Sequence, residues 1–399
     1  MAEQITADSV LRALGRVHDP EIRKPITDLG MIEDLTVTAG RVTLTLKLTI
    51  AGCPAAKQIT AETEQAIRAI PGVTDVDLTV SVMTPAERQA FAERVRGSKT
   101  REIPFTAKSL TRVICVTSGK GGVGKSSVTA GLAAALAARG RRVGVVDADV
   151  FGFSIPALFG LTKDGKTEWP TRVADMIIPP VAHGVSVISI GMFLGGEDPR
   201  TTAVSWRGPM LHRTVEQFLR DVYFGELDYL LLDLPPGTGD IAISVGQLLP
   251  HAEVIVVTTP QAAAADVAVR SALLAHQSGQ RVIGVIENMS GDIFGSGGGQ
   301  VAADRLTDAF NSAESVPVLG SLPLSAAFRE AGDTGLAEAI AAAVADPQAT
   351  EAAELDGPAA GESDPAAGES DPAIAELNRV AARIESLGRG LARRKLPLV

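Results

Sequence analysis

The stretch Gly119-Lys120-Gly121-Gly122-Val123-Gly124-Lys125-Ser126-Ser127 decides the fold of this chain. A glycine, four further residues and then Gly-Lys-Ser is the spacing of a loop that binds phosphate groups. The apolar run Val113–Val116 before the loop predicts a buried strand. The Ala- and Leu-rich run Ser127–Ala138 after it predicts a helix, with Gly140 placed to cap it. A strand, a glycine-rich loop and a helix in this order predict a nucleotide-binding α/β domain.

The chemistry of this loop predicts ATP and Mg²⁺ as cofactors. Its glycines allow backbone N–H groups to turn towards an anion, and the N-terminus of the following helix adds a partial positive charge. Lys125 is expected to reach the β- and γ-phosphates, and the Ser126 hydroxyl is expected to hold Mg²⁺. The predicted phosphate-binding residues are Gly119, Lys120, Gly121, Gly122, Val123, Gly124, Lys125, Ser126 and Ser127.

Two of the predicted strands end in aspartates. Asp147 and Asp149 follow Val143–Val146, and Asp233 follows Tyr229–Leu232. In an open parallel sheet, ligands bind beyond the carboxyl ends of the strands. We therefore expect Asp149 to orient the attacking water, and Asp147 and Asp233 to contact Mg²⁺. Because phosphoryl transfer depends mostly on positioning and charge neutralisation, these acids together with the loop lysines predict ATP hydrolysis.

Composition excludes several classes of protein. The chain has 399 residues, a formal net charge of −10 and a sequence pI near 5.1, which argue against binding to nucleic acid. No apolar run reaches the roughly 18 residues of a membrane span, and the N-terminus lacks the basic and apolar pattern of a signal peptide. Only two cysteines are present, which indicates a reducing, cytoplasmic location without a disulfide framework.

The first 95 residues predict a small α+β domain, followed by a polar linker over 96–105. A helical segment from Ala7 to Val17 precedes two strands that meet at the turn Ala39-Gly40. Within the second strand, Arg41–Ile50 alternates apolar and polar residues, so one face is expected to be packed and the other solvated. A helix over 55–70 and a strand over 73–82 complete this domain.

Residues 106–345 predict the nucleotide domain. Short, nearly all-apolar strands recur along it, and helical patterns separate most of them, which favours a mostly parallel, doubly wound sheet with helices on both faces. The expected strands are Val113–Val116, Val143–Val146, Val185–Ile190, Tyr229–Leu232, Val254–Val257 and Val282–Ile286.

The character of the chain changes over 346–372. An acidic heptad occupies 358–364 and repeats over 365–371, and its small, turn-prone residues cannot build a core. Residues 373–399 then predict a helix and a basic tail. The apolar face of that helix either packs back on the nucleotide domain, which we favour, or binds a membrane surface. Its apolar residues are Ile374, Leu377, Val380, Ala381, Ile384 and Leu387, and the basic residues that follow are Arg389, Arg393, Arg394 and Lys395.

The second lysine inside the phosphate loop narrows the class of ATPase. Lys120 resembles the additional lysine of the MinD/ParA-type ATPases, in which it crosses a dimer interface to the partner's nucleotide. The resemblance implies a homodimer and adds Lys120 to Lys125 and Asp149 as a catalytic residue. Asn288, near the end of a later strand, resembles the base-contacting Asn of the same class and is expected to bind the adenine.

Taken together, the motifs resemble those of one family, the Mrp/ApbC ATPases, which are iron–sulfur cluster carriers. The first 95 residues are similar to the small domain that bacterial Mrp proteins carry in front, which is related to SufT-type assembly factors. The resemblance implies that the chain binds clusters and transfers them to apoproteins or assembly factors. The supporting stretches are 119–127, 147–156, 206–210, 225–229, 233–240, 286–290, 294–299 and 332–335, with 19–21, 28–31 and 52–54 in the small domain.

The two cysteines do not identify the ligands of an iron–sulfur cluster. Family members that bridge a cluster across the dimer usually have a Cys-x-x-Cys pair after the Glu-Asn-Met-Ser segment. Here Ser290-Gly291-Asp292-Ile293 runs directly into Phe294-Gly295, and the cysteine pair is missing. Cys115 lies in the strand before the phosphate loop and is expected to be a buried structural residue. Cys53 lies beside a predicted helix start, which would lower its pKa, and is equally compatible with a functional iron–sulfur thiol and a structural one.

Three hypotheses therefore remain after sequence analysis. The first is a dimeric ATPase that carries iron–sulfur clusters through Cys53 or through thiols supplied by a partner. The second is a MinD/ParA-like switch, in which ATP drives dimerisation without a cluster. The third is an assembly scaffold whose N-terminal domain is the working part.

Overall fold

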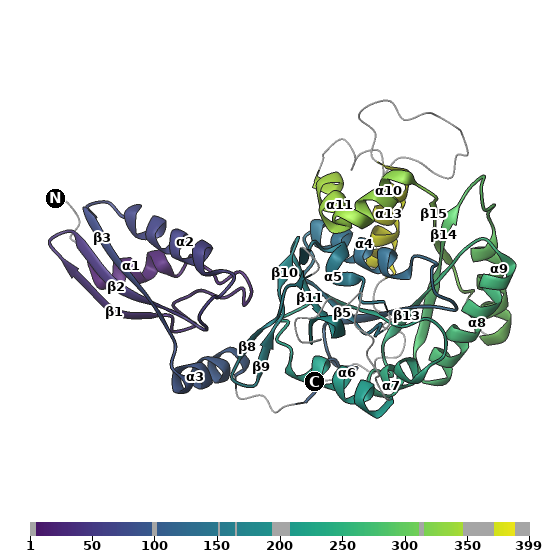
Figure 1. Ribbon diagram of the computed structural model, residues 1–399, viewed down its shortest axis with the longest axis horizontal. Coiled ribbons are helices and arrows are strands. Elements are labelled where there is room, and N and C mark those ends of the chain that lie inside the picture. Colours follow the sequence, from purple (N-terminus) through teal and green to yellow (C-terminus); the bar gives the residue numbers. More distant parts are fainter. Residues whose placement is uncertain are drawn as a thin grey trace, which may run out of the picture. The chain divides into compact units, whose positions relative to one another are not determined.

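The computed structural model describes residues 5–97, 102–150, 152–163, 166–193, 208–310, 315–345 and 371–387. The chain forms two compact units. The first combines Met1–Glu102 with Trp169–Val181 and Arg220–Gly225, and the second contains the remainder (Figure 1). Outside the described residues lie the acidic heptad repeat up to Ser370, the basic residues after 388 and Trp206-Arg207.

The first unit is built on a three-stranded sheet in the order β1-β2-β3. β1 (Ile32–Thr38) and β2 (Arg41–Leu48) are antiparallel, and β3 (Asp75–Val82) runs parallel to β2. The connection between β1 and β2 is the predicted Ala39-Gly40 turn. Both turn residues have positive φ angles, 47° and 86°, as a tight two-residue hairpin requires.

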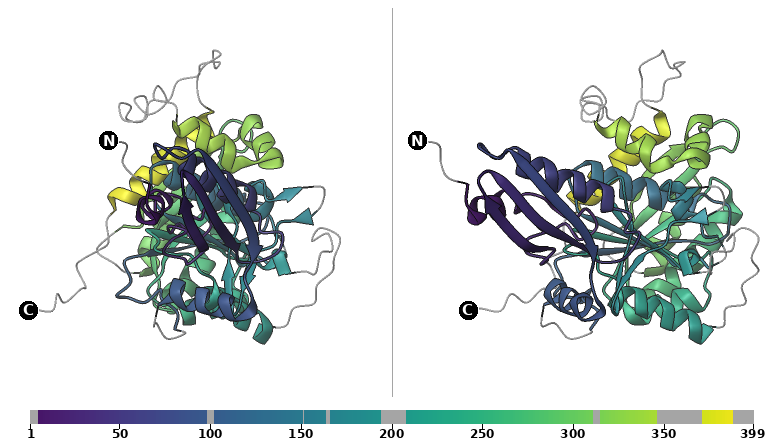
Figure 2. Two further views of the ribbon diagram at one scale, coloured as in Figure 1. Left: turned by 90° about the vertical axis from the view of Figure 1, so that its left-hand side faces the viewer. Right: turned by 60° about the vertical axis from the view of Figure 1, so that its left-hand side comes forward.

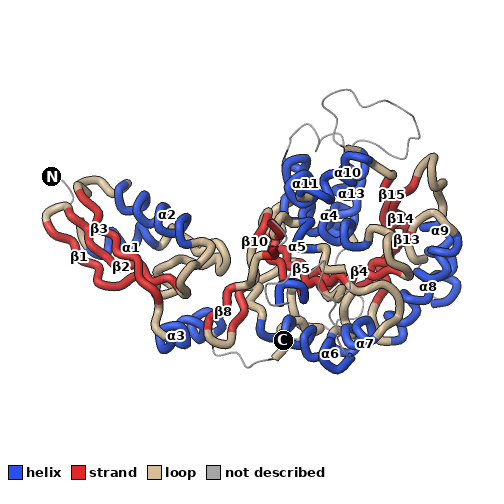
Figure 3. The backbone as a smooth tube through the Cα atoms, in the orientation of Figure 1, coloured by secondary structure: helices blue, strands red, loops and turns tan. Residues whose placement is uncertain are grey.

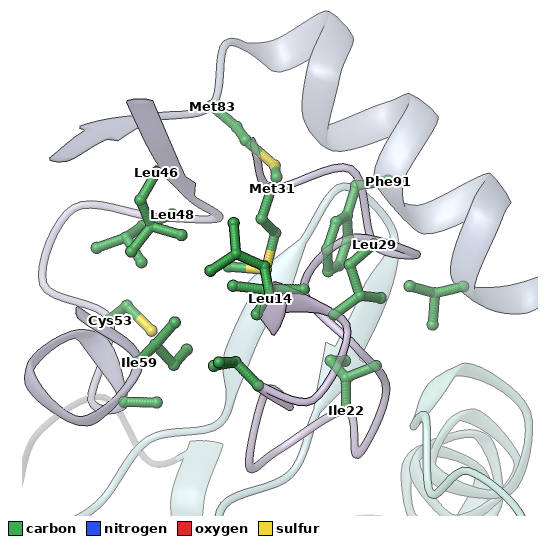
Figure 4. Packing of buried hydrophobic residues seen from close by; sticks show 14 of the residues in the cluster. Leu14, Ile22, Leu29, Met31, Leu46, Leu48, Cys53, Ile59, Met83 and Phe91 are labelled. Atoms are coloured by element: carbon green, nitrogen blue, oxygen red, sulfur yellow. The ribbon is translucent and has the colours of Figure 1, made fainter. Parts of the chain in front are cut away.

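The core of this unit lies between the sheet and two helices, α1 (Ala7–Leu14) and α2 (Ala56–Arg68). Because side chains alternate along a strand, β2 directs Val42, Leu44, Leu46 and Leu48 to the buried face, as its sequence pattern predicted. Figure 4 shows Leu46 and Leu48 packed near Cys53 and Ile59. The small α+β domain predicted from the sequence is therefore present.

A hairpin from the middle of the chain completes this core, and no local sequence pattern predicts it. β8 (Thr171–Val173) and β9 (Met176–Ile178) contribute Val173, Met176 and Ile178 to the same hydrophobic cluster. The turn between them is tied to α3 (Pro85–Arg96), because Arg96 Nη1 lies 2.9 Å from Asp175 Oδ1. Arg96, which sequence analysis placed at the start of the linker, is thus the last residue of a helix.

Helix α3 was not predicted, although its start signal is clear. The Thr84 hydroxyl accepts a hydrogen bond from the Glu87 backbone N–H, and the Glu87 carboxylate accepts one from the Thr84 backbone N–H. This reciprocal capping box, with Pro85 in the first turn, satisfies two N–H groups that a helix start otherwise leaves unpaired.

The second unit contains an eight-stranded sheet in the order β10-β11-β5-β12-β4-β13-β14-β15. The pairs from β11 to β15 are all parallel. β4, which leads into the phosphate loop, lies inside the sheet, so both its neighbours deliver their carboxyl ends beside that loop. The strands are β4 (Arg112–Ser118), β5 (Val143–Asp147), β10 (Val181–Ala182), β11 (Val185–Ser189), β12 (Tyr229–Asp233), β13 (Glu253–Thr258), β14 (Arg281–Ser290) and β15 (Val318–Pro323).

Helices cover both faces of this sheet (Figures 1 and 3). α4 (Lys125–Ala138) packs against β4, β5 and β12, while α8 (Ala262–Gln277) and α9 (Gly298–Phe310) pack against β13 and β14. The mostly parallel, doubly wound architecture is therefore confirmed. The sequence patterns did not predict β15 or several small elements. The other elements are α5 (Ile155–Leu158), β6 (Thr162–Lys163), β7 (Lys166–Thr167), a 3₁₀ helix (Ile190–Phe193), α6 (Gly208–Asp221), α7 (Asp240–Leu248), α10 (Ala326–Thr334) and α11 (Leu336–Ala345).

The predicted C-terminal helix, α13 (Pro372–Ser386), packs back on the nucleotide unit (Figure 2). Its apolar face is buried against α4 and β15, and Arg112 Nη1 donates to the Ile384 carbonyl at 2.6 Å. The alternative that we favoured from sequence is thus confirmed for the described helix. None of the described helices combines the length and apolarity that a membrane span requires.

Candidate nucleotide-binding site

The phosphate loop and the predicted acidic residues meet at one edge of the sheet. β4 ends at Ser118, immediately before the loop, and its neighbour β12 ends at Asp233. The next strand, β5, ends at Asp147, which is directly paired with Asp233 in the parallel register. The sequence prediction that parallel strands would bring these residues to the loop edge is confirmed by this register.

The loop conformation depends on its glycines. Gly122 and Gly124 have φ angles of 81° and 79°, which side chains rarely tolerate. Gly119 is required for a different reason, because a Cβ there would lie 2.2 Å from the backbone of Val267 on α8. The Gly237 N–H donates to the Ser118 carbonyl at 2.8 Å, so the Pro235–Gly239 loop is tied to the base of the phosphate loop.

Lys125 lies at the centre of the site. Its Nζ is 2.8 Å from Asp233 Oδ2 and 3.4 Å from Asp149 Oδ2, and its side chain is 6% exposed. The Ser126 hydroxyl donates to the same Asp233 Oδ2 at 2.6 Å. The structure therefore brings together the lysine, the hydroxyl and two of the acids that the sequence singled out.

Burial of several charges in one place shifts their pKa values. Burial alone would lower the pKa of the Lys125 ammonium, but the attraction of Asp233 and Asp149 outweighs it and holds that pKa above its ordinary value. Burial, reinforced by the charge of Asp233, raises the pKa of Asp147 to about 8. Burial also raises the pKa of Asp233, although Lys125 and the hydroxyls of Ser126 and Thr129 oppose it. Burial therefore favours the neutral form of Asp147, while the aspartates keep Lys125 charged.

The donors present fit a magnesium ion that is shared with phosphate oxygens. Mg²⁺ prefers oxygen ligands and usually retains several waters beside one or two carboxylates. The Ser126 hydroxyl and Asp233 Oδ2 supply such oxygens, while no three His, Cys, Asp or Glu side chains of the described residues are placed to hold a metal ion by themselves. Both oxygens of Asp147 already accept hydrogen bonds, from the Asp149 N–H at 3.1 Å and from the Ser189 hydroxyl at 2.8 Å.

Asn288 contacts the phosphate loop itself. Its Nδ2 donates to the Val123 carbonyl at 2.9 Å, and a Cβ on Gly124 would lie 2.2 Å from that nitrogen. The preceding residue, Glu287, accepts from the N–H groups of Gly297 and Gly299, at 3.2 and 2.6 Å. Two consecutive residues of β14 therefore hold the phosphate loop on one side and the start of α9 on the other. Binding of adenine by Asn288 stays a prediction.

Lys120 differs from the other predicted site residues because its side chain is exposed. Its backbone carbonyl accepts from the Ser118 hydroxyl at 3.1 Å, which fixes the loop at this point. No ion pair to its ammonium occurs within the described part of the chain. The side chain is consequently available to a group outside this copy of the chain.

Two protein-family models match this chain, and both are consistent with the geometry of the site. Residues 109–356 match the model described as "NUBPL iron-transfer P-loop NTPase", and residues 7–80 match the model of an iron–sulfur cluster assembly protein. The first match spans more than half of the chain and contains every residue of the site above.

This chain belongs to the iron-transfer P-loop NTPase family.

Similar proteins across bacteria agree with this family. The iron–sulfur cluster carrier protein of Mycobacterium tuberculosis is 51% identical over 341 residues, which cover 82% of this chain and 86% of that protein. The iron–sulfur cluster carrier protein of Synechocystis sp. is 36% identical over 343 residues, covering 83% of this chain and 91% of that protein. The resemblance identified from the sequence motifs, an ATPase that carries iron–sulfur clusters, is confirmed at the level of the family.

Two solved structures also resemble this chain. The nucleotide-binding protein of Archaeoglobus fulgidus in complex with ADP is 32% identical, with 59% of this chain and 93% of that chain covered and a TM-score of 0.46. The septum site-determining protein MinD of Pyrococcus horikoshii, complexed with Mg-ADP, is 21% identical. In that comparison 72% of this chain and 100% of that chain are covered, with a TM-score of 0.47.

Cys53, the candidate iron–sulfur ligand, belongs to the first unit. It is 8% exposed and lies two residues before Ala55, which precedes α2. The expectation of a lowered pKa was wrong. Burial raises the pKa of the Cys53 thiol, and the nearby charges of Glu21 and Asp19 add to this. Hydrogen bonds from the backbone of Ala55 and Ala56 do lower it, as a helix start should, but they are outweighed.

Cys115 has the structural role that its position in the strand predicted. It is fully buried in β4, and burial raises the pKa of its thiol to about 12. Of the two cysteines in this chain, Cys53 is thus the one with any exposure to solvent.

Three polar residues near the site were missed by sequence analysis. Thr129 and Ser189 hydrogen-bond to Asp233 and Asp147, and Glu287 supports the start of α9. Thr129 had a usable signal, because residues four apart on a helix share a face and Thr129 is four residues after Lys125. Ser189 contacts Asp147 on a strand 42 residues away, so no local pattern marks it. Glu287 reaches N–H groups 10 and 12 residues further along the chain, through a loop whose path the sequence does not predict.

Proposed function

We propose that this chain is an ATP-hydrolysing carrier that receives iron–sulfur clusters and transfers them to apoproteins or assembly factors. The observation that carries the proposal is the convergence of Lys125, Ser126, Asp149 and Asp233 at the carboxyl edge of a parallel sheet. Membership of the iron-transfer family supports iron as the cargo. Both cysteines are free thiols, which supports a reducing compartment, and we expect the protein in the cytoplasm.

Each residue of the site has its own role in the proposed phosphoryl transfer. Lys125 neutralises charge on the β- and γ-phosphates, and the backbone N–H groups of the glycine loop orient them. Asp149 holds the attacking water, while Asp147 fixes Asp149 by accepting its backbone N–H at 3.1 Å. Ser126 and Asp233 would hold Mg²⁺, which supplies charge neutralisation at the phosphate oxygens when it is bound. Asp147 remains a further candidate contact of the ion.

The cargo requires thiolates that this chain does not supply in full. A 4Fe–4S cluster takes four cysteine ligands, whereas Cys115 is fully buried in β4 and Cys53, at 8% exposure, is the one thiol with any exposure to solvent. We therefore propose that Cys53 contributes one ligand and that a second copy, a donor or a recipient protein contributes the others. Transfer to the recipient then exchanges one set of thiolates for another.

Anaerobic reconstitution with iron and sulfide tests the cargo. We expect the full chain to take up a cluster, read by its visible absorbance, and to pass it to an apoferredoxin. Cys53→Ala should lose this uptake, and Cys115→Ala is the matched control because it removes a thiol that solvent does not reach. Equal uptake by wild type and Cys53→Ala would contradict a role for Cys53 as ligand.

One observation favours a second candidate, a nucleotide-dependent switch or scaffold without a cluster of its own. In place of a Cys-x-x-Cys pair, the chain has a short loop closed by two hydrogen bonds between Gly291 and Gly295, at 2.9 and 2.7 Å. Its tip carries Ile293, which is 76% exposed. ATP hydrolysis without cluster uptake by any variant, even with a recipient apoprotein present, would establish this second function.

We further propose that the working form is a homodimer in which Lys120 completes the site of the partner subunit. The exposed ammonium of Lys120 supports this, because it pairs with no carboxylate in the described part of its own chain. Lys120→Ala should leave ATP binding nearly intact and reduce hydrolysis, since it removes a charge that acts on the transition state.

Mixing two variants tests the geometry of this dimer. In a heterodimer of Lys120→Ala with Asp149→Ala, one site receives both an intact lysine and an intact aspartate only if they come from opposite chains. Recovery of activity in the mixture supports the arrangement. No recovery, in a sample shown to contain heterodimers, would mean that Lys120 acts within its own subunit.

A further inference from the structure

Thr129 makes a contact that the phosphate-loop motif does not explain. It lies on α4, one turn after Lys125, and is fully buried. Its Oγ1 is 2.9 Å from Asp233 Oδ1 and 2.9 Å from the Lys125 carbonyl oxygen. Lys125 and Ser126 both contact the other oxygen, Oδ2. Thr129 is therefore the side chain that holds the second oxygen of this carboxylate within the described residues.

A threonine inside a helix often donates to the carbonyl four residues earlier, and that bond alone would be structural. The hydroxyl has a single proton, however, and here two acceptors compete for it at equal distance. An ionised carboxylate is the stronger acceptor, and in helix geometry the Lys125 carbonyl also receives the backbone N–H of residue 129. The proton of Thr129 therefore belongs to Asp233.

We propose that Thr129 is a positioning residue that fixes the orientation of the Asp233 carboxylate. By binding Oδ1, it prevents rotation of the carboxylate and keeps Oδ2 directed towards the Ser126 hydroxyl, where a divalent cation would bind. Groups that orient a metal-binding side chain from behind commonly contribute 10–100-fold to metal affinity. The inference rests on the proposed nucleotide chemistry, and adds to it a residue that sets the affinity for Mg²⁺.

The test measures the Mg²⁺ concentration at half-saturation for binding of N-methylanthraniloyl-ATP to the full chain, read by fluorescence. Thr129→Val keeps the size of the side chain and removes the hydroxyl, so we expect half-saturation to rise about 10-fold or more. Binding without Mg²⁺ should not change, and excess Mg²⁺ should restore the wild-type amplitude. Thr129→Ser keeps the hydroxyl and should remain within about twofold of wild type.

Thr63→Val is the matched control for the loss of a buried helix hydroxyl. Thr63 is fully buried on α2, in the other unit, and its Oγ1 has no hydrogen-bond partner in the described residues. The substitution should leave the Mg²⁺ dependence unchanged. The unfolding temperature of each variant shows whether it is folded. If Thr129→Val does not fold, Thr129→Ala removes the same hydroxyl without placing a methyl group against the carboxylate.

Two outcomes would overturn the inference. One is a hydroxyl-free variant with the Mg²⁺ dependence of wild type. The other is a variant whose affinity for the nucleotide falls equally with and without Mg²⁺, which would show a general effect on α4. Failure of the wild type to bind the nucleotide at all would instead reject the proposed function, so the two failures are distinguishable.

Discussion

Two regions of this chain bury carboxylates, and they stabilise them by different means. At the sheet edge that carries the phosphate loop, here called the nucleotide edge, Asp233 is held by the Lys125 ammonium and by the hydroxyls of Ser126 and Thr129. In the first unit, Asp19 is 4% exposed, and its Oδ1 accepts only backbone N–H groups, those of Glu21 and Ile22, both at 2.9 Å. Among the described residues no cation pairs with Asp19. Side chains thus stabilise the Asp233 carboxylate, whereas backbone N–H groups stabilise that of Asp19.

The different groups around the two carboxylates indicate which kind of ligand each region suits. The nucleotide edge has a fixed cation and several oxygen donors, so it suits a ligand that brings both phosphate and a divalent cation. The first unit has a buried acid close enough to raise the pKa of the neighbouring thiol of Cys53. Buried charge without compensation costs stability, and such costs tend to persist where function requires them. The nucleotide edge therefore matches the proposed ATP site, whereas a role of the first unit as a ligand site stays a proposal.

The largest effects are expected at the nucleotide edge. In the proposed mechanism Lys125 is the cation that binds the phosphates, so we expect Lys125→Ala to lower affinity for ATP and turnover together. Asp149→Ala should keep ATP bound and lower hydrolysis by about 100-fold or more, because the role proposed for Asp149 is to orient water and not phosphate. Steady-state hydrolysis together with equilibrium nucleotide binding checks both variants. Full turnover in either variant would remove that residue from the mechanism.

Thiol reactivity extends the comparison to the two cysteines. In the folded protein we expect iodoacetamide to modify Cys53 at least about 10-fold faster than Cys115, as measured by peptide mass spectrometry. Cys115 is fully buried and its pKa is about 12, so it reacts only when the second unit unfolds. Cys53 retains 8% exposure, although its own pKa is raised.

ATP with Mg²⁺ provides the control for this experiment. A ligand that binds the folded second unit lowers the population of its unfolded form, so it should slow modification of Cys115 further and leave Cys53 unchanged. In denaturant the two rates should become similar. Equal rates in the native protein would show that β4 opens far more readily than its burial implies.

Local patterns in the sequence predicted the nucleotide edge well. The phosphate loop is contiguous, and Asp147 and Asp233 directly follow apolar strands, so the parallel sheet alone brings them together. The hairpin β8–β9 could not be predicted as part of the first unit, because its contacts join residues about 80 positions apart, such as Arg96 and Asp175. The pKa of Cys53 was predicted in the wrong direction for a related reason. The helix start is visible in the sequence, whereas the burial that outweighs it is not.

The smallest effect is expected for Asp19→Asn, which tests whether the buried charge of the first unit costs stability. An Asn Oδ1 can accept the same backbone N–H groups from Glu21 and Ile22, and the substitution removes the charge. Burial raises the pKa of Asp19 above its ordinary 3.8, so the folded state binds the proton more tightly than the unfolded state does. The stability of the wild type therefore falls as pH rises from 3.8 through that raised pKa, and stays lower above it.

Asp19→Asn lacks this ionisation, so its stability advantage over the wild type should be largest at neutral pH. The advantage should disappear below pH 3.8, where Asp19 is protonated in both the folded and the unfolded protein. Hydrogen exchange at the amides of β2 measures the gain in unfolding free energy of the first unit. In thermal unfolding, each 1 kcal/mol of that gain corresponds to a rise of about 4–8 °C in the unfolding temperature of a domain of this size. Removing the charge should also lower the pKa of Cys53 and speed its alkylation. A variant less stable than wild type at neutral pH would show that the ionised carboxylate is the better acceptor for those N–H groups. The contrast between the two regions would then be one of geometry alone.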